Sequence, residues 1–199
     1  MKKENSNVFT TLGASNHLLN EKRQEDDFYT TDIKAINGLK RMLEKYNFQI
    51  PNLLIEPAVG NGNIANEFPN NKWIGYDIVD RGYPNTIFKS FLEVENLPEE
   101  EKMIITNPPY KFAKEFVNKS LDLIEDGEYT IFLLKTTFLE GKSRRTELFD
   151  KHELKYVWVF SERVGCLKND KPSKDSSAVS YSWFVFQKGY NNLPIIDWI

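Results

Sequence analysis

A short stretch in the middle of the chain, Asn107-Pro108-Pro109-Tyr110, combines residue types that can hold a planar amine. It follows Met103-Ile104-Ile105-Thr106, a run typical of a buried strand. The prolines fix their φ angles and lack a backbone N–H, so the strand ends in a rigid corner whose carbonyls can accept hydrogen bonds. With the Asn107 side-chain oxygen they offer two acceptors to an NH2 group, and the Tyr110 ring can stack on a flat ligand. Adenine fits this description, although the tetrapeptide alone is equally compatible with a simple strand-ending turn.

A second set of residues follows two other predicted strands. Glu56, Gly60 and Gly62 come after one apolar run, and Asp77 ends the next. Ligands of open α/β sheets bind beyond the carboxyl ends of the strands, where an acid after the second strand typically binds ribose. The glycines allow a close approach of the backbone, and a helix that begins after them would favour a carboxylate at its N-terminus.

Short apolar segments alternate with helical periodicity and predict an α/β fold. We expect one mainly parallel, seven-stranded sheet with helices on both faces. The last two strands have no helix between them, so we expect them to pair antiparallel. Thr31 or Asp32 is a plausible N-cap of the first helix. The predicted strands are 52–57, 72–77, 86–88, 103–106, 129–134, 156–160 and 179–187, and the predicted helices are 33–43, 64–68, 111–125 and 143–149.

Together these segments resemble the S-adenosylmethionine-dependent DNA adenine-N6 methyltransferases, with small phage and prophage enzymes as the closest likeness. The family signature Asp/Asn/Ser-Pro-Pro-Tyr/Phe corresponds to residues 107–110, and the cofactor motif Glu-Pro-Ala-x-Gly-x-Gly to residues 56–62. Asp77 matches a second acidic motif, and Phe28-Tyr29-Thr30-Thr31 is similar to an aromatic-Thr-Pro segment. The resemblance covers roughly residues 25–190. It implies a single Rossmann-like class I methyltransferase domain that uses S-adenosylmethionine.

The resemblance also implies residue roles. Asn107 Oδ1 and the Pro108 carbonyl would accept both amino hydrogens of a flipped-out DNA adenine, on which Tyr110 would stack. Positioning would supply most of the acceleration, and no metal is expected. Ser90 departs from a common Asp, and Thr31 from the usual Pro. The implied cofactor residues are Tyr29, Thr30, Thr31, Glu56, Pro57, Ala58, Gly60, Gly62, Asp77, Ile78, Ser90, Phe91 and Asn107, and the implied catalytic residues are Asn107, Pro108, Pro109 and Tyr110.

Composition indicates one domain with a sizeable core, since 40% of the 199 residues are hydrophobic and 28% are charged. No apolar run approaches the roughly 20 residues that span a membrane. Cys166 is the single cysteine, which favours a reducing cytosol. The resemblance to phage and prophage enzymes implies the cytoplasm of a bacterial or phage-infected cell. We expect a flexible tail over residues 1–25 and a catalytic domain over residues 26–199, without a separate target-recognition domain.

The net charge of −3 argues against a protein that coats nucleic acid by charge alone. Residues 141–174 are nevertheless basic, with nine Lys or Arg against five Asp or Glu. This stretch is a candidate DNA-binding surface. A homodimer or a protein partner is a further possible source of recognition. The candidate nucleic-acid contacts are Lys142, Arg144, Arg145, Arg163, Lys168, Lys171 and Lys174.

Two alternatives stay open from the sequence. Asn-Pro-Pro-Tyr also occurs in enzymes that methylate RNA adenine or a protein glutamine. The glutamine enzymes resemble Asp-x-Gly-x-Gly-Ser-Gly in the cofactor motif and usually carry a helical N-terminal domain, neither of which is found here. The second alternative is a catalytically silent binding protein with the methyltransferase fold, which the acidic net charge motivates.

Overall fold

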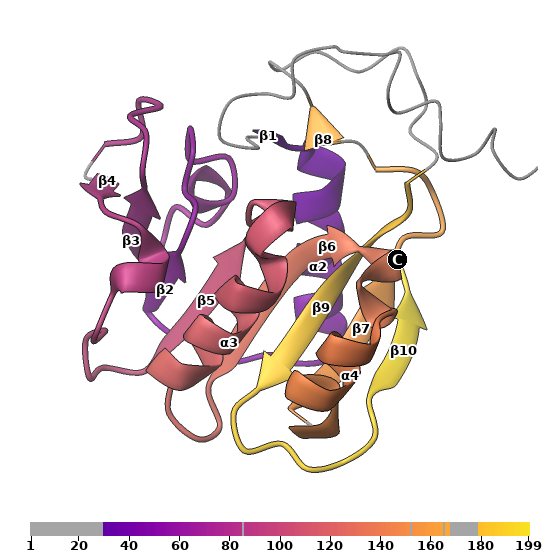
Figure 1. Ribbon diagram of the computed structural model, residues 1–199. Coiled ribbons are helices and arrows are strands. Elements are labelled where there is room, and N and C mark those ends of the chain that lie inside the picture. The colour runs from indigo at the N-terminus through magenta and orange to yellow at the C-terminus, as the bar shows by residue number, and fades with distance from the viewer. Residues whose placement is uncertain (1–29, 85, 152, 165, 168–178) are drawn as a thin grey trace, which may run out of the picture.

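The computed structural model describes residues 30–84, 86–151, 153–164, 166–167 and 179–199. Within these ranges the main sheet has eight strands in the order β10-β7-β9-β6-β5-β2-β3-β4 (Figure 1). Two further strands, β1 and β8, pair antiparallel with each other. The strands are β1 (Thr30–Thr31), β2 (Leu53–Glu56), β3 (Lys72–Asp77), β4 (Thr86–Phe88), β5 (Lys102–Thr106), β6 (Tyr129–Lys135), β7 (Leu154–Val159), β8 (Cys166–Leu167), β9 (Tyr181–Gln187) and β10 (Ile195–Trp198).

The predicted fold class is confirmed. Strands β4, β3, β2, β5 and β6 pair parallel with one another, whereas β9 lies antiparallel to both β6 and β7. The sheet has one strand more than the seven predicted, because β10 adds parallel to β7 at the edge. At this edge three of the four residues of β10 stay exposed. Its sequence therefore lacks the alternating or fully apolar pattern of a buried strand.

Helices cover both faces of the sheet, as predicted. Helix α2 (Ile33–Lys45) lies behind the sheet in Figure 1, and α3 (Ala113–Leu123) and α4 (Lys142–Glu147) lie in front. Asp32 is the N-cap of α2, since its side chain accepts a hydrogen bond from Lys34 N at 2.9 Å. The Trp183 indole donates to the Ala35 carbonyl at 2.9 Å and fastens α2 to the middle of the sheet.

The connecting helices are shorter than predicted. Residues 64–68 form only the 3-10 turn η3 (Ala65–Glu67), so the expected helix N-terminus for a carboxylate is wrong at this position. The predicted helix 111–125 is divided into η5 (Tyr110–Phe112) and α3. The other 3-10 turns are η4 (Phe91–Glu93), η6 (Thr136–Leu139) and η7 (Phe149–Lys151).

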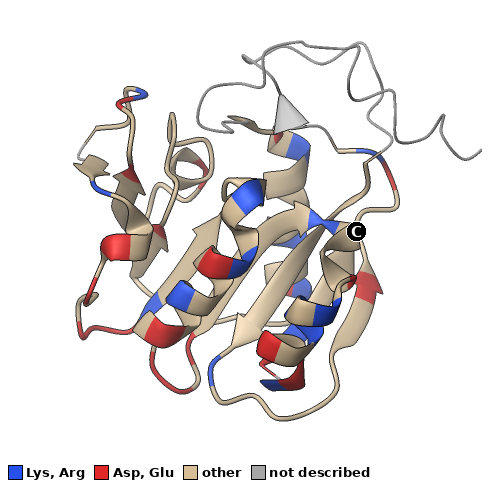
Figure 2. Ribbon diagram, viewed as in Figure 1, with Lys and Arg blue, Asp and Glu red and all other residues tan. Residues whose placement is uncertain are grey.

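Acidic residues gather at the amino end of the parallel strands, in the loops that lead into β5 and β6 (Figure 2). Neither loop contains a lysine or arginine. None of the helices in the described part of the chain is long and apolar enough to cross a membrane. The predicted tail, residues 1–25, lies outside the described residues. The acidic residues of these loops are Glu95, Glu99, Glu100, Glu101, Glu125, Asp126 and Glu128.

Candidate active site

A cavity of about 540 Å³ opens at the carboxyl ends of β2, β3 and β5. Its volume lies within the roughly 300–1,000 Å³ of small-molecule and cofactor sites. Predicted residues from five separate segments line it, which confirms that the topology brings these segments together. The predicted residues in its wall are Thr30, Thr31, Glu56, Pro57, Ala58, Asp77, Ile78, Ser90, Phe91, Asn107 and Pro109.

The loop after β2 is held by the carboxylate of Asp77. Gly60 N donates to Asp77 Oδ2 at 2.9 Å, and Val79 N donates to Oδ1 at 3.0 Å. Gly60 and Gly62 both have positive φ, of 55° and 82°. A Cβ on Gly62 would lie 2.1 Å from Cδ2 of Tyr83, so the loop requires glycine there. Both glycines lie in the loop after β2, and neither is part of the cavity wall.

Glu56 is a buried acid at the end of β2, with only 3% of its surface exposed. Burial raises the pKa of its carboxyl well above the usual value, and the nearby Asp77 raises it further, against a backbone hydrogen bond from Ala65 that lowers it. Its Oε2 atom makes no hydrogen bond to any described residue. A cationic ligand in the cavity would compensate this buried group.

Asn107 lines the cavity from the loop after β5, the strand that pairs with β2. Its Nδ2 donates to Thr31 Oγ1 at 3.2 Å, which joins the predicted Asn-Pro-Pro-Tyr corner to the predicted Tyr-Thr-Thr segment. The Thr31 carbonyl in turn accepts from Asn63 Nδ2 at 3.2 Å. Pro109 lines the cavity, while Pro108 is buried beneath the corner.

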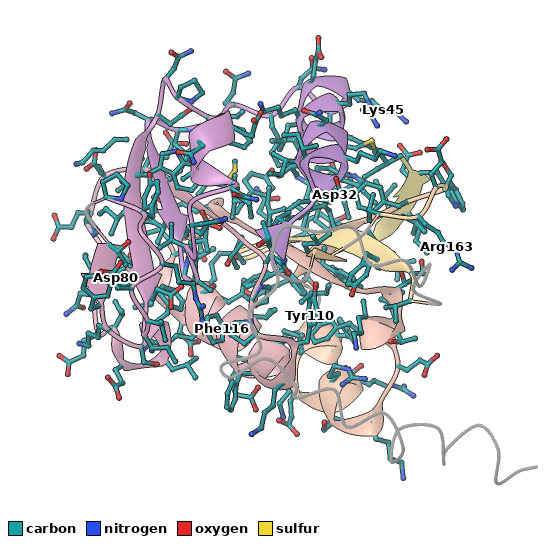
Figure 3. All side chains as sticks on the ribbon, turned by 90° about the horizontal axis from the view of Figure 1, so that it is seen from above. Asp32, Lys45, Asp80, Tyr110, Phe116 and Arg163 are labelled. Atoms are coloured by element: carbon teal, nitrogen blue, oxygen red, sulfur yellow. The ribbon has the colours of Figure 1, made fainter. Side chains whose placement is uncertain are left out.

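Tyr110 is half-buried beside the cavity and does not belong to its wall. In the view from above (Figure 3), it lies near the centre of this edge, between Phe116 and Arg163. Its ring centroid lies 5.7 Å from that of Tyr181, and Lys135 Nζ lies 5.5 Å from the Tyr110 centroid. The Tyr110 ring therefore already has an aromatic and a cationic neighbour.

Apolar side chains form the other part of the wall, and sequence reasoning missed several of them. Ile78 is 63% exposed and Phe112 42% exposed, although both are large and hydrophobic. Phe112 ends η5 and faces the cavity. Its position three residues after Pro109 was the available signal. The missed residues are Val59, Asn61, Asn63, Ile64, Arg81, Lys89, Leu92, Lys111, Phe112 and Phe116.

The predicted nucleic-acid contacts differ in their surroundings. Arg144 Nε donates to the Phe138 carbonyl at 2.8 Å and its guanidinium lies 5.1 Å from the Phe138 ring, so this side chain stabilises the turn before α4. Arg145 forms a long ion pair of 3.7 Å with Asp150. Lys142 and Arg163 are exposed. Lys168, Lys171, Lys174 and the predicted cofactor residue Tyr29 lie outside the described residues.

No protein-family model matches the chain, and no curated protein matches its sequence. Solved structures do match. A proposed class I S-adenosylmethionine-dependent methyltransferase from Listeria monocytogenes gives a TM-score of 0.63 at 12% identity, over 94% of this chain and 69% of that one. The modification subunit of a proposed type I restriction enzyme from Vibrio vulnificus gives 0.60 at 12% identity, over 85% and 47%. The 23S rRNA methyltransferase ErmE gives 0.52 at 16% identity, over 83% and 72%.

These similarities define the class of the fold. At such low identity they show that the chain has the Rossmann-like fold of class I methyltransferases. The chain spans about half the length of the Vibrio vulnificus subunit. Function must therefore be argued from the residues of the cavity.

Proposed function

We propose that this protein transfers a methyl group from S-adenosylmethionine to the exocyclic N6 amine of adenine in DNA. One observation carries the proposal: a single cavity has the carboxyl groups of Glu56 and Asp77 on its β2–β3 wall and Asn107 and Pro109 of the Asn-Pro-Pro-Tyr corner on its β5 wall. The likeness in fold to S-adenosylmethionine-dependent methyltransferases supports the same cofactor.

The residues of the β2–β3 wall fit this cofactor. S-adenosylmethionine, when bound, supplies an electrophilic methyl group on a sulfonium, and it also carries an ammonium. Glu56 is the buried acid that such cations would compensate, and Asp77 is the acid suited to ribose hydroxyls. Ile78 and Phe112 present exposed apolar surface within the wall, on which an adenine ring can pack.

The β5 wall suits the target base. Asn107 Oδ1 and the Pro108 carbonyl would accept the two hydrogens of the amine, which orients the nitrogen lone pair and holds the amine still. Tyr110 would stack on the base after a local movement of Lys135, whose ammonium lies over the ring. As the new N–C bond formed, the methyl–sulfur bond of the sulfonium would break to leave a neutral thioether, and the amine would release one proton to solvent. The amide oxygens of the corner would orient the amine through hydrogen bonds.

Charge distribution supports a nucleic-acid substrate despite the net charge of −3. The acidic loops before β5 and β6 lie at the opposite end of the parallel strands from the cavity. Cations follow the carboxyl ends of five strands and would meet phosphates around the opening. Recognition by a second copy or a protein partner is part of this proposal. These cations are Arg81, Lys89, Lys111, Lys135 and Arg163.

Transfer of radiolabelled methyl groups from S-adenosylmethionine tests the proposal. Unmethylated duplex DNA, single-stranded DNA, RNA and a glutamine-containing peptide are offered separately, and labelled DNA is digested to nucleosides. We expect the label in N6-methyladenine from DNA. Label only in RNA or in the peptide would replace the proposed substrate. No label in any acceptor, together with tight cofactor binding, would favour a silent binding protein.

A further inference from the structure

We propose that Thr31 is a positioning residue for Asn107. Its hydroxyl accepts the hydrogen bond from Asn107 Nδ2 at 3.2 Å and so sets the direction in which Asn107 Oδ1 faces. This inference rests on the proposed function, because the amide oxygen is the group that would hold the target amine. Thr31 occupies the place where the resemblance expects proline, a residue that has no hydroxyl.

Thr31 is itself fixed by contacts on three sides. Its backbone pairs with Cys166 in the β1–β8 ladder, and its carbonyl accepts from Asn63 Nδ2 at 3.2 Å. The next residue, Asp32, caps helix α2. The side chain of Thr31 is buried, with 5% of the residue exposed. A β-branched side chain on a fixed backbone has few rotamers, so its hydroxyl is a rigid acceptor.

Asn107 has less support from its own chain. It follows β5 as a half-buried residue, and the proline after it favours an extended backbone conformation but acts on the backbone alone. Oδ1 and Nδ2 branch from the same carbon, so anchoring Nδ2 also fixes Oδ1. The hydrogen bond to Thr31 Oγ1 opposes a rotation about χ2 that would place the amide donor where an acceptor is required.

The neighbouring threonine has a different environment. Thr30 also lines the cavity and is buried, but its Oγ1 makes no hydrogen bond to any described residue. A buried hydroxyl in this state is available to a ligand. We therefore expect removal of the Thr30 hydroxyl to affect cofactor affinity, and removal of the Thr31 hydroxyl to affect turnover.

Three substitutions test the role of the Thr31 hydroxyl. Thr31→Val removes the acceptor, and we expect kcat to fall about tenfold with the dissociation constant for S-adenosylmethionine within about twofold. Thr31→Ser keeps the hydroxyl and should recover most of the rate. Thr130→Val is the matched control, because Thr130 is a buried threonine of β6 outside the cavity wall. A Thr31→Val enzyme with wild-type kcat would overturn the inference.

Nuclear magnetic resonance provides a readout that is independent of turnover. In protein labelled with 15N-asparagine, the side-chain amide of Asn107 is assigned by its loss in Asn107→Asp. We expect this signal to move in Thr31→Val and to stay near its wild-type position in Thr31→Ser and Thr130→Val. An unmoved signal in Thr31→Val overturns the inference whether or not DNA is methylated. A wild-type protein that methylates no DNA overturns the proposed function, and the positioning role fails with it.

Discussion

The two walls of the cavity hold their polar groups by different means. The β2–β3 wall contains two carboxyl groups. Asp77 accepts hydrogen bonds from Gly60 N and Val79 N, and Glu56 is buried. On the β5 wall, the contact between Asn107 and Thr31 is neutral, and prolines fix the backbone.

This difference separates binding from chemistry. Burial raises the pKa of the Glu56 carboxyl, so the protonation state of this group depends on pH and on the charge of a nearby ligand. Amides and hydroxyls do not titrate in the physiological range. We therefore expect the affinity for the cofactor to depend on the β2–β3 wall and on pH, and the methyl-transfer step to depend on the β5 wall.

The largest effect is expected for Asn107→Ala. Loss of the amide removes an acceptor that matters mainly in the reaction itself, so we expect kcat to fall by at least about a hundredfold. The dissociation constant for S-adenosylmethionine should stay nearly unchanged. Radiolabel transfer measures kcat, and equilibrium dialysis on the same preparation measures the dissociation constant. An equal loss of activity and of affinity would contradict the assignment of chemistry to the β5 wall and of cofactor binding to the β2–β3 wall.

Asp77→Ala should weaken cofactor binding, the quantity that Asn107→Ala leaves nearly unchanged. The variant loses a charged acceptor for Gly60 N and for the ribose, and such hydrogen bonds contribute about 1.5–3 kcal/mol. We expect the cofactor dissociation constant to rise roughly ten- to a hundredfold. Asp80→Ala is the control, because Asp80 also accepts from a loop amide, that of Gly82, but lies outside the cavity wall. Unchanged affinity in Asp77→Ala would refute the ribose assignment.

Gly62→Ala tests the backbone of the same wall. Its φ of 82° and the 2.1 Å approach to Tyr83 predict a loss of about 2–3 kcal/mol in the free energy of unfolding. Gly82→Ala has a similar φ of 87° with no atom within 4 Å of the new Cβ, so it should lose only about 1 kcal/mol. Denaturant unfolding of both variants measures the difference, and equal losses would mean that Tyr83 moves aside.

Glu56→Gln is expected to have the smallest effect at a single pH. Because burial raises the pKa of Glu56, the folded protein keeps a proton that the unfolded chain releases above about 4.5. Stability conferred by this group is thus greatest at low pH and falls as pH rises toward the raised pKa. Glu56→Gln should remove this decline, which unfolding curves between pH 5 and 8 would reveal; an unaltered pH dependence would exclude Glu56 as its source.

The sequence predicted the main segments that meet at the cavity because its signals are local. Strand ends, the Gly-x-Gly spacing and the Pro-Pro corner each follow from a few consecutive residues, and the parallel topology then brings them to one edge. The contact between Asn107 and Thr31 joins residues 76 positions apart. No periodicity or spacing contains such information.

The strand that the sequence did not predict has a tertiary cause. Strand β10 depends on pairing with β7 rather than on its own pattern, and Asp197 anchors it through Lys45, the last residue of α2, and Tyr46, the C-cap of that helix. The sequence pattern of β10 cannot identify these partners. The predicted nucleic-acid contact of Arg144 stays a prediction, and in the structure its guanidinium binds the Phe138 carbonyl.

Calorimetric titration of the wild-type protein with S-adenosylmethionine tests the central claim most directly. We predict one cofactor bound per chain, with proton release that differs in heat between buffers, because a cation beside Glu56 favours its ionised form. Affinity should therefore increase with pH. An absence of binding, or binding that releases no proton and ignores both pH and Asp77→Ala, would contradict the account.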